Sequence, residues 1–159
     1  MREVADRNGW TKATCIHTPM LSGLKGSGGR MDSFDHKMSK SDPNNAILMH
    51  DDLDSLRKKM KKAFLEVGNS SSAVFEMVEY IILPRLGKVN VTPNPKYGEP
   101  SEYSDLESFT KAVSDGTVHP LDAKMAVAEG LAEVLSPVSE HFSTRTELMS
   151  AINSITGSQ

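Results

Sequence analysis

The chain has 159 residues, of which 38% are hydrophobic, and its 18 basic and 21 acidic residues give a formal net charge of −3, so the composition is that of an ordinary globular protein rather than a disordered one. The single cysteine excludes an internal disulfide, and no group of cysteines and histidines has the spacing of a zinc site, so a disulfide-built secreted protein and a zinc finger are excluded. The longest apolar runs are far too short to span a bilayer, so we expect no membrane partner and a cytoplasmic location.

Charge is distributed unevenly along the chain. Residues 1–98 contain 15 basic and 11 acidic residues, a net charge of +4, whereas residues 99–159 contain 3 basic and 10 acidic residues, a net charge of −7. The asymmetry is either ordinary surface variation or a sign that the two parts meet different partners.

The first part of the chain predicts a helix end, a strand and a long loop. Residues 2–7 look like the last turns of a helix that ends at Asn8-Gly9, because glycine readily adopts the positive φ of a helix stop. Residues 13–17 are interpreted as a short buried strand, with Cys15 as a buried apolar residue within it. Residues 22–45 then form a long loop, and long loops in small proteins are disproportionately functional.

Residues from about 51 onward predict a mostly helical region. Apolar residues recur at spacings of three and four over residues 51–64, which predicts an amphipathic helix. A second helix is expected over residues 73–83, stopped near Pro84. Residues 89–103 are expected to be irregular, with room for short strands.

Three further helices are expected in the last third of the chain. The first begins with a capping box made by Ser104 and Glu107. The second begins with Pro120 and is kinked or ended by Pro137. The third is capped by Thr144 and buries three apolar side chains: Leu148, Ile152 and Ile155. The fold class predicted from these patterns is mainly α.

The stretch Lys37-Met38-Ser39-Lys40-Ser41 carries the strongest functional signal. This string is expected by chance in roughly one chain in ten thousand of this length. Two flexible lysines on a glycine-rich loop suit nucleotide activation, because they can follow a polyphosphate and neutralise the charge that develops on departing pyrophosphate. The serines add hydroxyl donors, and Asp42-Pro43 predicts a short turn that fixes the far end of the loop. A merely solvated basic loop would account for two lysines but not for the full string.

The string matches the KMSKS motif of class I aminoacyl-tRNA synthetases. Residues 15–24, Cys-Ile-His-Thr-Pro-Met-Leu-Ser-Gly-Leu, resemble the strand and loop before this motif in tyrosyl-tRNA synthetases of the archaeal and eukaryotic type. Tryptophanyl-tRNA synthetases share the continuation at residues 41–44, so that segment does not choose between the two. Residues 119–124, His-Pro-Leu-Asp-Ala-Lys, resemble the His-Pro-x-Asp-x-Lys element of the tyrosyl anticodon-binding domain and favour the tyrosyl enzymes.

The resemblance implies roles for individual residues. Lys37 and Lys40 would be catalytic, and further residues of the loop and its lead-in would bind ATP: Met20, Leu21, Met38, Ser39 and Ser41. The full enzyme would use ATP and Mg²⁺ to activate tyrosine, would transfer it to tRNA(Tyr), and would be a homodimer.

A base-binding site is predicted at the start of the helix that begins with Pro120. His119 directly precedes that helix and Asp122 lies in its first turn, so both side chains project from one helix end, while Tyr97 is an aromatic residue upstream. A base could stack between Tyr97 and His119 while Asp122 accepts hydrogen bonds from its Watson–Crick edge. By resemblance this base is the first anticodon nucleotide. The alternative is that His119 only caps the helix.

Residues 57–62 place five cations on one helix. Arg57, Lys58, Lys61 and Lys62 are candidate contacts to the phosphates of the tRNA body. An equally weighted alternative is a solvated helix face that complements the helix macrodipole.

The resemblance divides the chain into two parts. Residues 1–50 would be the C-terminal remnant of a Rossmann-type α/β catalytic domain with the KMSKS loop, and residues 51–159 a helical anticodon-binding domain. The chain has no HIGH-type motif and lacks most of the tyrosine pocket, so we expect a fragment that is inactive alone. Residues 30–36 look like an insertion of unassigned role. Two other interpretations stay open: part of a tryptophanyl enzyme, and a non-catalytic tRNA-binding module derived from a synthetase.

Overall fold

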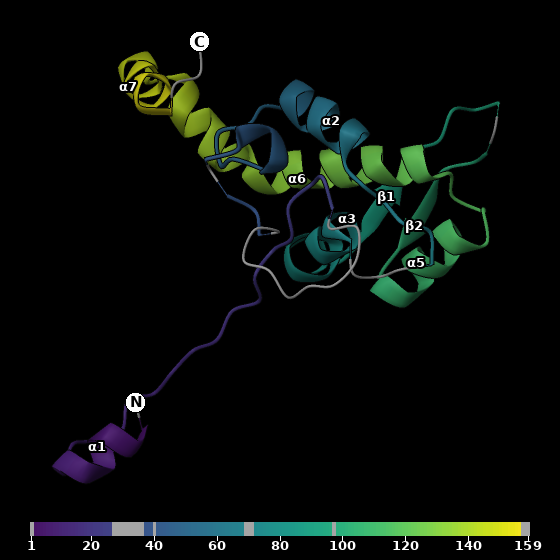
Figure 1. The fold of residues 1–159 in the computed structure, drawn as a ribbon. Coiled ribbons are helices and arrows are strands. Elements are labelled where there is room, and N and C mark those ends of the chain that lie inside the picture. The colour runs from purple at the N-terminus through teal and green to yellow at the C-terminus, as the bar shows by residue number, and fades with distance from the viewer. Residues whose placement is uncertain (1, 27–36, 40, 69–71, 97, 157–159) are drawn as a thin grey trace.

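The computed structural model consists of a helical body with one small sheet, from which a short N-terminal helix projects (Figure 1). It describes residues 2–26, 37–39, 41–68, 72–96 and 98–156. In chain order the elements are α1 (Arg2–Asn8), the 3₁₀ turn η2 (Pro43–Asn45), α2 (Leu53–Lys62), α3 (Ala73–Met77), the π-helical segment η3 (Val78–Ile82), α4 (Leu83–Leu86), β1 (Val89–Val91), β2 (Ser101–Tyr103), α5 (Leu106–Ser114), α6 (Pro120–Ser143) and α7 (Thr146–Thr156). The mainly α fold class is confirmed for the described residues.

The N-terminal segment differs from the prediction. α1 ends at Asn8 and Gly9 has a φ of +64°, as expected for a glycine stop. Residues 13–17, however, form no strand, and Cys15 is exposed rather than buried. A strand is stable only when a neighbour pairs with its backbone, and no described segment lies beside this one. Residues 10–20 instead run as an exposed extended segment that joins α1 to the body (Figure 1).

The predicted amphipathic helix over residues 51–64 is confirmed as α2. Its first turn is capped by Asp52, whose carboxylate accepts a 2.7 Å hydrogen bond from the backbone N–H of Ser55. Leu56 and Met60 are fully buried against the long helix α6, along which α2 packs. Acidic residues at the start of α2 and lysines at its end both complement the helix dipole.

Replacing Asp52 by alanine is expected to lower the free energy of unfolding by about 0.5–2 kcal/mol at pH 7. The hydrogen bonds from Ser55 hold the pKa of Asp52 below its ordinary value. The contribution of the carboxylate is therefore complete above the unfolded pKa of about 3.9 and is lost as the pH falls through the lower folded pKa. Urea unfolding of both proteins at pH 7 and pH 3 measures the difference. A difference of the same size at both pH values would contradict this account.

The helix predicted to stop near Pro84 continues to Leu86. α3, η3 and α4 follow one another without a break, and Pro84 is the second residue of α4. The segment before Pro84 is π-helical, with the N–H of Leu83 bonded to the carbonyl of Val78, so the usual α-helical hydrogen-bond pattern is already interrupted where the proline lacks its N–H. The helical run ends instead at Gly87, whose φ is +74° and whose N–H donates to the carbonyl of Leu83.

The short strands allowed for between residues 89 and 103 are present. β1 and β2 pair antiparallel, with Val89 opposite Tyr103 and Val91 opposite Ser101. Both valines are buried, so β1 presents one apolar face to α6. The hairpin thereby fixes the two ends of the segment 92–100, part of which lines the pocket described below.

The predicted capping box at the start of α5 is wrong by one residue. Asp105, not Ser104, is the N-cap, and its carboxylate accepts a 2.7 Å hydrogen bond from the backbone N–H of Ser108. This bond holds the pKa of Asp105 below its ordinary value. The pair predicted to cap the helix, Ser104 and Glu107, has the same spacing as the observed pair, Asp105 and Ser108. Asp105 is the cap because an ionised carboxylate is a stronger acceptor than a hydroxyl.

α6 passes through Pro137 and ends only at Ser143, so Pro137 does not end the helix, while a kink there stays a prediction. A proline inside a helix leaves the carbonyl four residues earlier without its usual donor, and here that carbonyl belongs to Glu133. The hydroxyl of Ser136 donates a 3.0 Å hydrogen bond to this carbonyl. The local sequence therefore compensates the proline, and the helix continues.

The core lies where α2, α3, η3 and β1 pack against α6, and α5, which contacts β2, adds Phe109 to it (Figure 1). Phe75 and Phe109 are its largest fully buried side chains, and their rings meet edge to face with centroids 6.0 Å apart. Leu24, from the loop that precedes the helical region, is part of the same core. Small residues on α6 permit close packing: a Cβ added at Gly130 would lie 3.0 Å from the Cδ1 of Ile82.

The burial predicted for the last helix is wrong. Leu148 is 44% exposed and Ile155 is 85% exposed. α7 touches the end of α6, so its apolar residues beyond that contact face outward. Within the described ranges, no helix has the length and hydropathy needed to cross a membrane.

Candidate functional site

The lysine–serine stretch at residues 37–41 begins against an earlier part of the chain. Lys37 lies opposite Ser22 in an antiparallel bridge, and the N–H of Met38 donates a 2.9 Å hydrogen bond to the carbonyl of Leu21. Lys37 itself is exposed. Lys40, the second predicted catalytic residue, lies outside the described residues. We call residues 20–26 the incoming stem of this loop and residues 41–51 its outgoing stem.

The two serines of the stretch bond to each other at the start of the outgoing stem. Their hydroxyl oxygens lie 2.8 Å apart, and the N–H of Asp42 donates to the carbonyl of Ser39. Asp42 then leads into η2, so the turn predicted at Asp42-Pro43 is confirmed. Lys25 of the incoming stem donates to Asp42 at 2.6 Å, which ties the stems together and lowers the pKa of the Asp42 carboxyl.

The incoming stem is fastened to the helical body. Leu24 is buried, and its carbonyl accepts a 2.7 Å hydrogen bond from the N–H of Phe64, just beyond α2. Gly26 has a φ of +70°, and a Cβ there would lie 2.5 Å from the Phe64 ring. Ser22 gives both its donors to Glu76 of α3, with the N–H at 2.7 Å and the hydroxyl at 2.8 Å. The predictions from sequence did not include Glu76, although it is the one acidic residue in the apolar run of residues 73–78.

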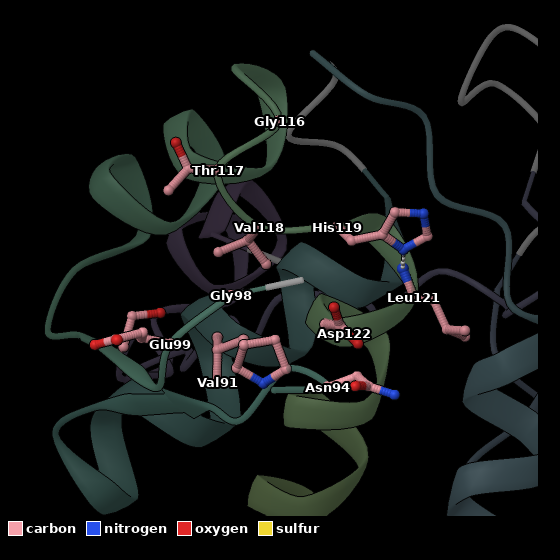
Figure 2. Close-up of a pocket in the computed structure, with 12 residues that line it drawn as sticks. Val91, Asn94, Gly98, Glu99, Gly116, Thr117, Val118, His119, Leu121 and Asp122 are labelled. Carbon is pink, nitrogen blue, oxygen red and sulfur yellow. Dashed lines mark hydrogen bonds between the residues drawn. The ribbon is translucent and has the colours of Figure 1, made fainter. Parts of the chain in front are cut away.

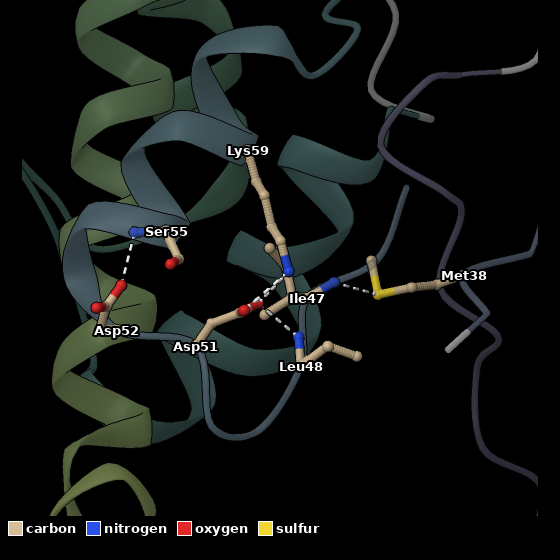
Figure 3. A network of polar contacts seen from close by, with 7 residues as sticks. All are labelled: Met38, Ile47, Leu48, Asp51, Asp52, Ser55 and Lys59. Carbon is tan, nitrogen blue, oxygen red and sulfur yellow. Dashed lines mark hydrogen bonds and ion pairs between the residues drawn. The ribbon is translucent and has the colours of Figure 1, made fainter. Parts of the chain in front are cut away.

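The outgoing stem is fastened to α2 (Figure 3). The carboxylate of Asp51 accepts a 2.7 Å hydrogen bond from the N–H of Leu48 and forms a 2.6 Å ion pair with Lys59. The N–H of Ile47 lies 3.3 Å from the sulfur of Met38. Asp51 and Lys59 are both largely shielded from solvent, so this pair fixes the turn that returns the loop to α2.

The five cations of residues 57–62 are divided between structural and free roles. Lys59 forms an ion pair with Asp51, and Arg57 forms a 2.9 Å ion pair with Glu129 of α6. The exposed cations that remain on this helix for another partner are Lys58, Lys61 and Lys62. Two of the five cations therefore serve the fold and three face solvent, while contact with tRNA phosphates stays a prediction.

A second feature is a pocket of about 670 Å³ at the N-terminal end of α6 (Figure 2). Its walls come from the segment after β1, the turn after α5 and the first turn of α6; the lining residues are Val91, Pro93, Asn94, Gly98, Glu99, Ser101, Gly116, Thr117, Val118, His119, Leu121 and Asp122. His119 and Asp122, predicted to project from one helix end, do line one cavity. Tyr97 lies outside the described residues, but its neighbour Gly98 lines the same pocket.

His119 caps α6. Its Nδ1 accepts a 3.1 Å hydrogen bond from the N–H of Leu121, so the neutral ring carries its proton on Nε2. Capping uses only one ring nitrogen, and His119 is exposed, which leaves the ring face and the Nε2–H for a ligand. The predicted alternative of a cap is thus confirmed, and it is compatible with stacking.

Asp122 is half-buried at the pocket and has no hydrogen-bond or ion-pair partner among the described residues. Four further polar residues line the pocket and were not predicted, and two of them, Asn94 and Glu99, lie beside Tyr97 in the sequence. The Oδ1 of Asn94 accepts from the N–H of Lys96, which leaves its amide nitrogen as a donor. The signal that could have found both is their position beside Tyr97 in a proline-rich segment between short strands. Acceptors and a donor beside an exposed ring are suited to bind a planar base.

Comparisons with known proteins show the family to which the chain belongs. Residues 1–136 match the family described as "tRNA synthetases class I (W and Y)". The chain belongs to this family. Among the curated proteins, the tyrosine–tRNA ligase of Picrophilus torridus is 40% identical over 141 residues, covering 87% of this synthetase chain and 42% of the relative. The Aeropyrum pernix ligase is 39% identical over 147 residues, covering 86% and 40%.

Solved synthetase structures show the same similarity. The crystal structure of the tyrosyl-tRNA synthetase of Aeropyrum pernix has a TM-score of 0.78 at 34% identity and covers 98% of this chain and 43% of that one. The Pyrococcus horikoshii enzyme complexed with L-tyrosine has a TM-score of 0.73 at 31% identity, covering 85% and 39%. This synthetase chain thus spans about two-fifths of the length of the relatives it matches.

Proposed function

We propose that this chain is the C-terminal part of a tyrosine–tRNA ligase, in which it supplies the lysine–serine loop and reads the first anticodon nucleotide of tRNA(Tyr). The relatives named above are tyrosine–tRNA ligases, which favours tyrosine over tryptophan within the family. The division predicted from sequence belongs to the proposal: residues 1–50 as a remnant of the Rossmann-type catalytic domain and residues 51–159 as the anticodon-binding domain. The homodimer and the cytoplasmic location are proposed with it.

The observation that carries the proposal is the pocket at the start of α6. It joins an exposed ring, His119, to a carboxylate without a described partner, Asp122. Guanine offers an imino and an amino donor side by side on its Watson–Crick edge, and one carboxylate can accept both. The cavity, at about 670 Å³, is large enough for a base. Tyr97, beside Gly98, is proposed as the second stacking ring.

The lysine–serine loop is proposed to act on ATP. The tyrosine carboxylate would attack the α-phosphate, pyrophosphate would leave, and the acyl group would then pass to the 3′ end of the tRNA. Lys37 and Lys40 would neutralise charge on the leaving pyrophosphate. The remaining residues of the proposed ATP site stand on the same loop and its incoming stem: Met20, Leu21, Met38, Ser39 and Ser41.

Mg²⁺ is proposed as the counter-ion that accompanies ATP. Within the described ranges, no group of three or more histidine, cysteine or acidic residues could hold a metal ion. We therefore assign none of the described residues to Mg²⁺.

The exposed lysines of α2 are proposed to contact tRNA phosphates: Lys58, Lys61 and Lys62. Arg57 is included in this proposal, but it would have to break its ion pair with Glu129 to contact a phosphate. Such contacts are independent of sequence and weaken steeply with salt. Residues 99–159, which include His119 and Asp122, carry a net charge of −7, so selective binding must come from the pocket.

The test is a binding titration of this chain with tRNA(Tyr) at low salt. Asp122→Ala, and replacement of guanine at the first anticodon position, are each expected to raise Kd by about tenfold or more, because each removes hydrogen bonds to a charged group. Glu133→Ala is the matched control, since it removes the same charge from the same helix at an exposed position away from the pocket.

A second variant in the same titration separates capping from stacking. His119→Asn keeps a side-chain acceptor at the N-cap but removes the ring. It should leave the unfolding midpoint nearly unchanged and raise Kd about 5- to 150-fold, since stacking of a base contributes about 1–3 kcal/mol. Binding that ignores the anticodon base, Asp122 and His119, and that disappears at modest salt, would mean that only the lysines of α2 touch the RNA.

A further inference from the structure

A buried carboxylate lies under the incoming stem of the lysine–serine loop. Glu76 of α3 is 8% exposed, and the helical residues around it are apolar. No described lysine, arginine or histidine forms an ion pair with it; its two oxygens accept instead from the N–H and the hydroxyl of Ser22, which is 54 residues away in sequence. Burying a carboxylate without a cation is unfavourable. Two bonds to one residue, however, fix both where that residue lies and how it is turned.

Ser22, held in place by Glu76, in turn pairs with the backbone of Lys37. The two residues are opposite each other in the antiparallel bridge, and the bond from Met38 N–H to Leu21 carbonyl, at 2.9 Å, lies beside it. Glu76 is therefore separated from the backbone of Lys37 by a single residue. Leu24, two residues after Ser22, is buried in the core and so holds the incoming stem against the helical body.

The outgoing stem is held independently by the ion pair of Asp51 with Lys59. The incoming stem thus rests on α3 and on Phe64 just beyond α2, the outgoing stem rests on α2, and Lys37 is paired with the incoming stem. A flexible lysine is useful only if its backbone is fixed within reach of the charge that it must meet.

We propose that Glu76 is a positioning residue for Lys37: through Ser22, it holds the backbone of the lysine–serine loop at a set place on the helical body. The catalytic consequence rests on the proposed function, because it requires that Lys37 acts on ATP. The positional claim requires only this chain.

The positional claim is tested by hydrogen exchange of the Met38 amide in this chain. In Glu76→Gln one oxygen is replaced by a donor, so one of the two donors of Ser22 loses its acceptor. Protection of Met38 N–H should fall about tenfold to hundredfold, while the amide of Phe109 in the core keeps its protection. Glu79→Gln is the matched control: Glu79 is exposed on the neighbouring helical turn and should change protection less than about twofold.

Ser22→Ala gives a second route to the same test, should Glu76→Gln unfold the chain. It removes the hydroxyl at a half-buried loop position and should also lower the protection of Met38. The double variant should lose less than the sum of the two single losses, because both remove the same contact. Protection of Met38 that is equal in the unaltered chain, in Glu76→Gln and in Ser22→Ala would overturn the positional claim.

The catalytic consequence is tested in the complete ligase by exchange of pyrophosphate into ATP. Glu76→Gln should lower kcat about tenfold and leave KM for tyrosine unchanged, because a displaced lysine affects the leaving pyrophosphate rather than the amino acid. Reduced protection of Met38 together with an unchanged kcat would overturn this role. Absence of exchange in the unaltered ligase would contradict the proposed function instead, and leave the hydrogen-exchange result to decide the positional claim.

Discussion

Replacing Lys37 by alanine is expected to lower kcat for pyrophosphate exchange by about 10²–10³-fold in the complete ligase, which is the usual effect of removing one donor aimed at developing charge. Lys37 is exposed at the start of the loop, and its backbone is fixed opposite Ser22. Its side chain has no hydrogen-bond or ion-pair partner among the described residues, so none of these competes with a phosphate for it. KM for tyrosine should stay within about twofold, because the lysine acts on the leaving group.

The control for this prediction is Lys88→Ala. Lys88 pairs with Glu102 at 2.6 Å beside the small sheet, so the variant removes an exposed lysine without touching the loop. It should leave kcat within about twofold of the unaltered enzyme. A similar loss in both variants would indicate a general effect of charge, and no loss in Lys37→Ala would remove Lys37 from the reaction.

Features that depend on neighbouring residues could be predicted from the sequence. The helix start at His119-Pro120 is local, and the sequence correctly indicated that His119 and Asp122 project from the same end of α6. α2 was predictable for the same reason, since its apolar spacing and its terminal charges lie within 14 residues of chain. Of the segment opposite this helix end, the sequence indicated only Tyr97. Asn94 and Glu99 were missed, because the pairing of β1 with β2 is what brings the segment after β1 to the pocket.

Features that depend on distant partners were mispredicted or missed. Residues 13–17 have strand-forming composition but no described neighbour to pair with, so they remain extended and exposed. Glu76 gave a weak signal as one acid in an apolar run, and its partner Ser22 could be identified only from the fold.

The basic helix illustrates why a run of like charges is ambiguous in sequence. Arg57 and Lys59 have acidic partners on α6 and at the end of the loop, Glu129 and Asp51, and neither partner is visible from the spacing within residues 57–62. The two lysine positions that follow Met60 remain exposed. The number of cations free for RNA is therefore a property of the fold rather than of the run, and it limits how much nonspecific binding α2 can supply.

Replacing Phe109 by alanine is expected to lower the free energy of unfolding of this chain by about 3–5 kcal/mol, a large part of the stability of a typical domain. Phe109 of α5 is fully buried and meets two aromatic rings edge to face, Phe75 at 6.0 Å and Tyr103 at 5.5 Å between centroids. Urea unfolding measures the loss. Phe109→Leu, which retains most of the buried volume, should cost less than about 1.5 kcal/mol and keeps the prediction testable if the alanine variant does not fold.

The substitution of Phe109 is also expected to affect the pocket at the N-terminal end of α6. α5 leads directly into the turn that forms one wall of the pocket, and the N–H of Val118 donates a 2.8 Å hydrogen bond to the carbonyl of Ala112 on α5. Loosening α5 should therefore weaken selective tRNA binding as well as stability. Phe64→Ala is the control: this ring is 44% exposed and remote from the pocket, so its loss should cost about 1–1.5 kcal/mol and leave discrimination of the anticodon base intact. Equal losses of stability in Phe109→Ala and Phe64→Ala would show that the buried ring of Phe109 does not hold α5 in place. The turn after α5, which forms one wall of the pocket, would then depend on the hairpin and α6 instead.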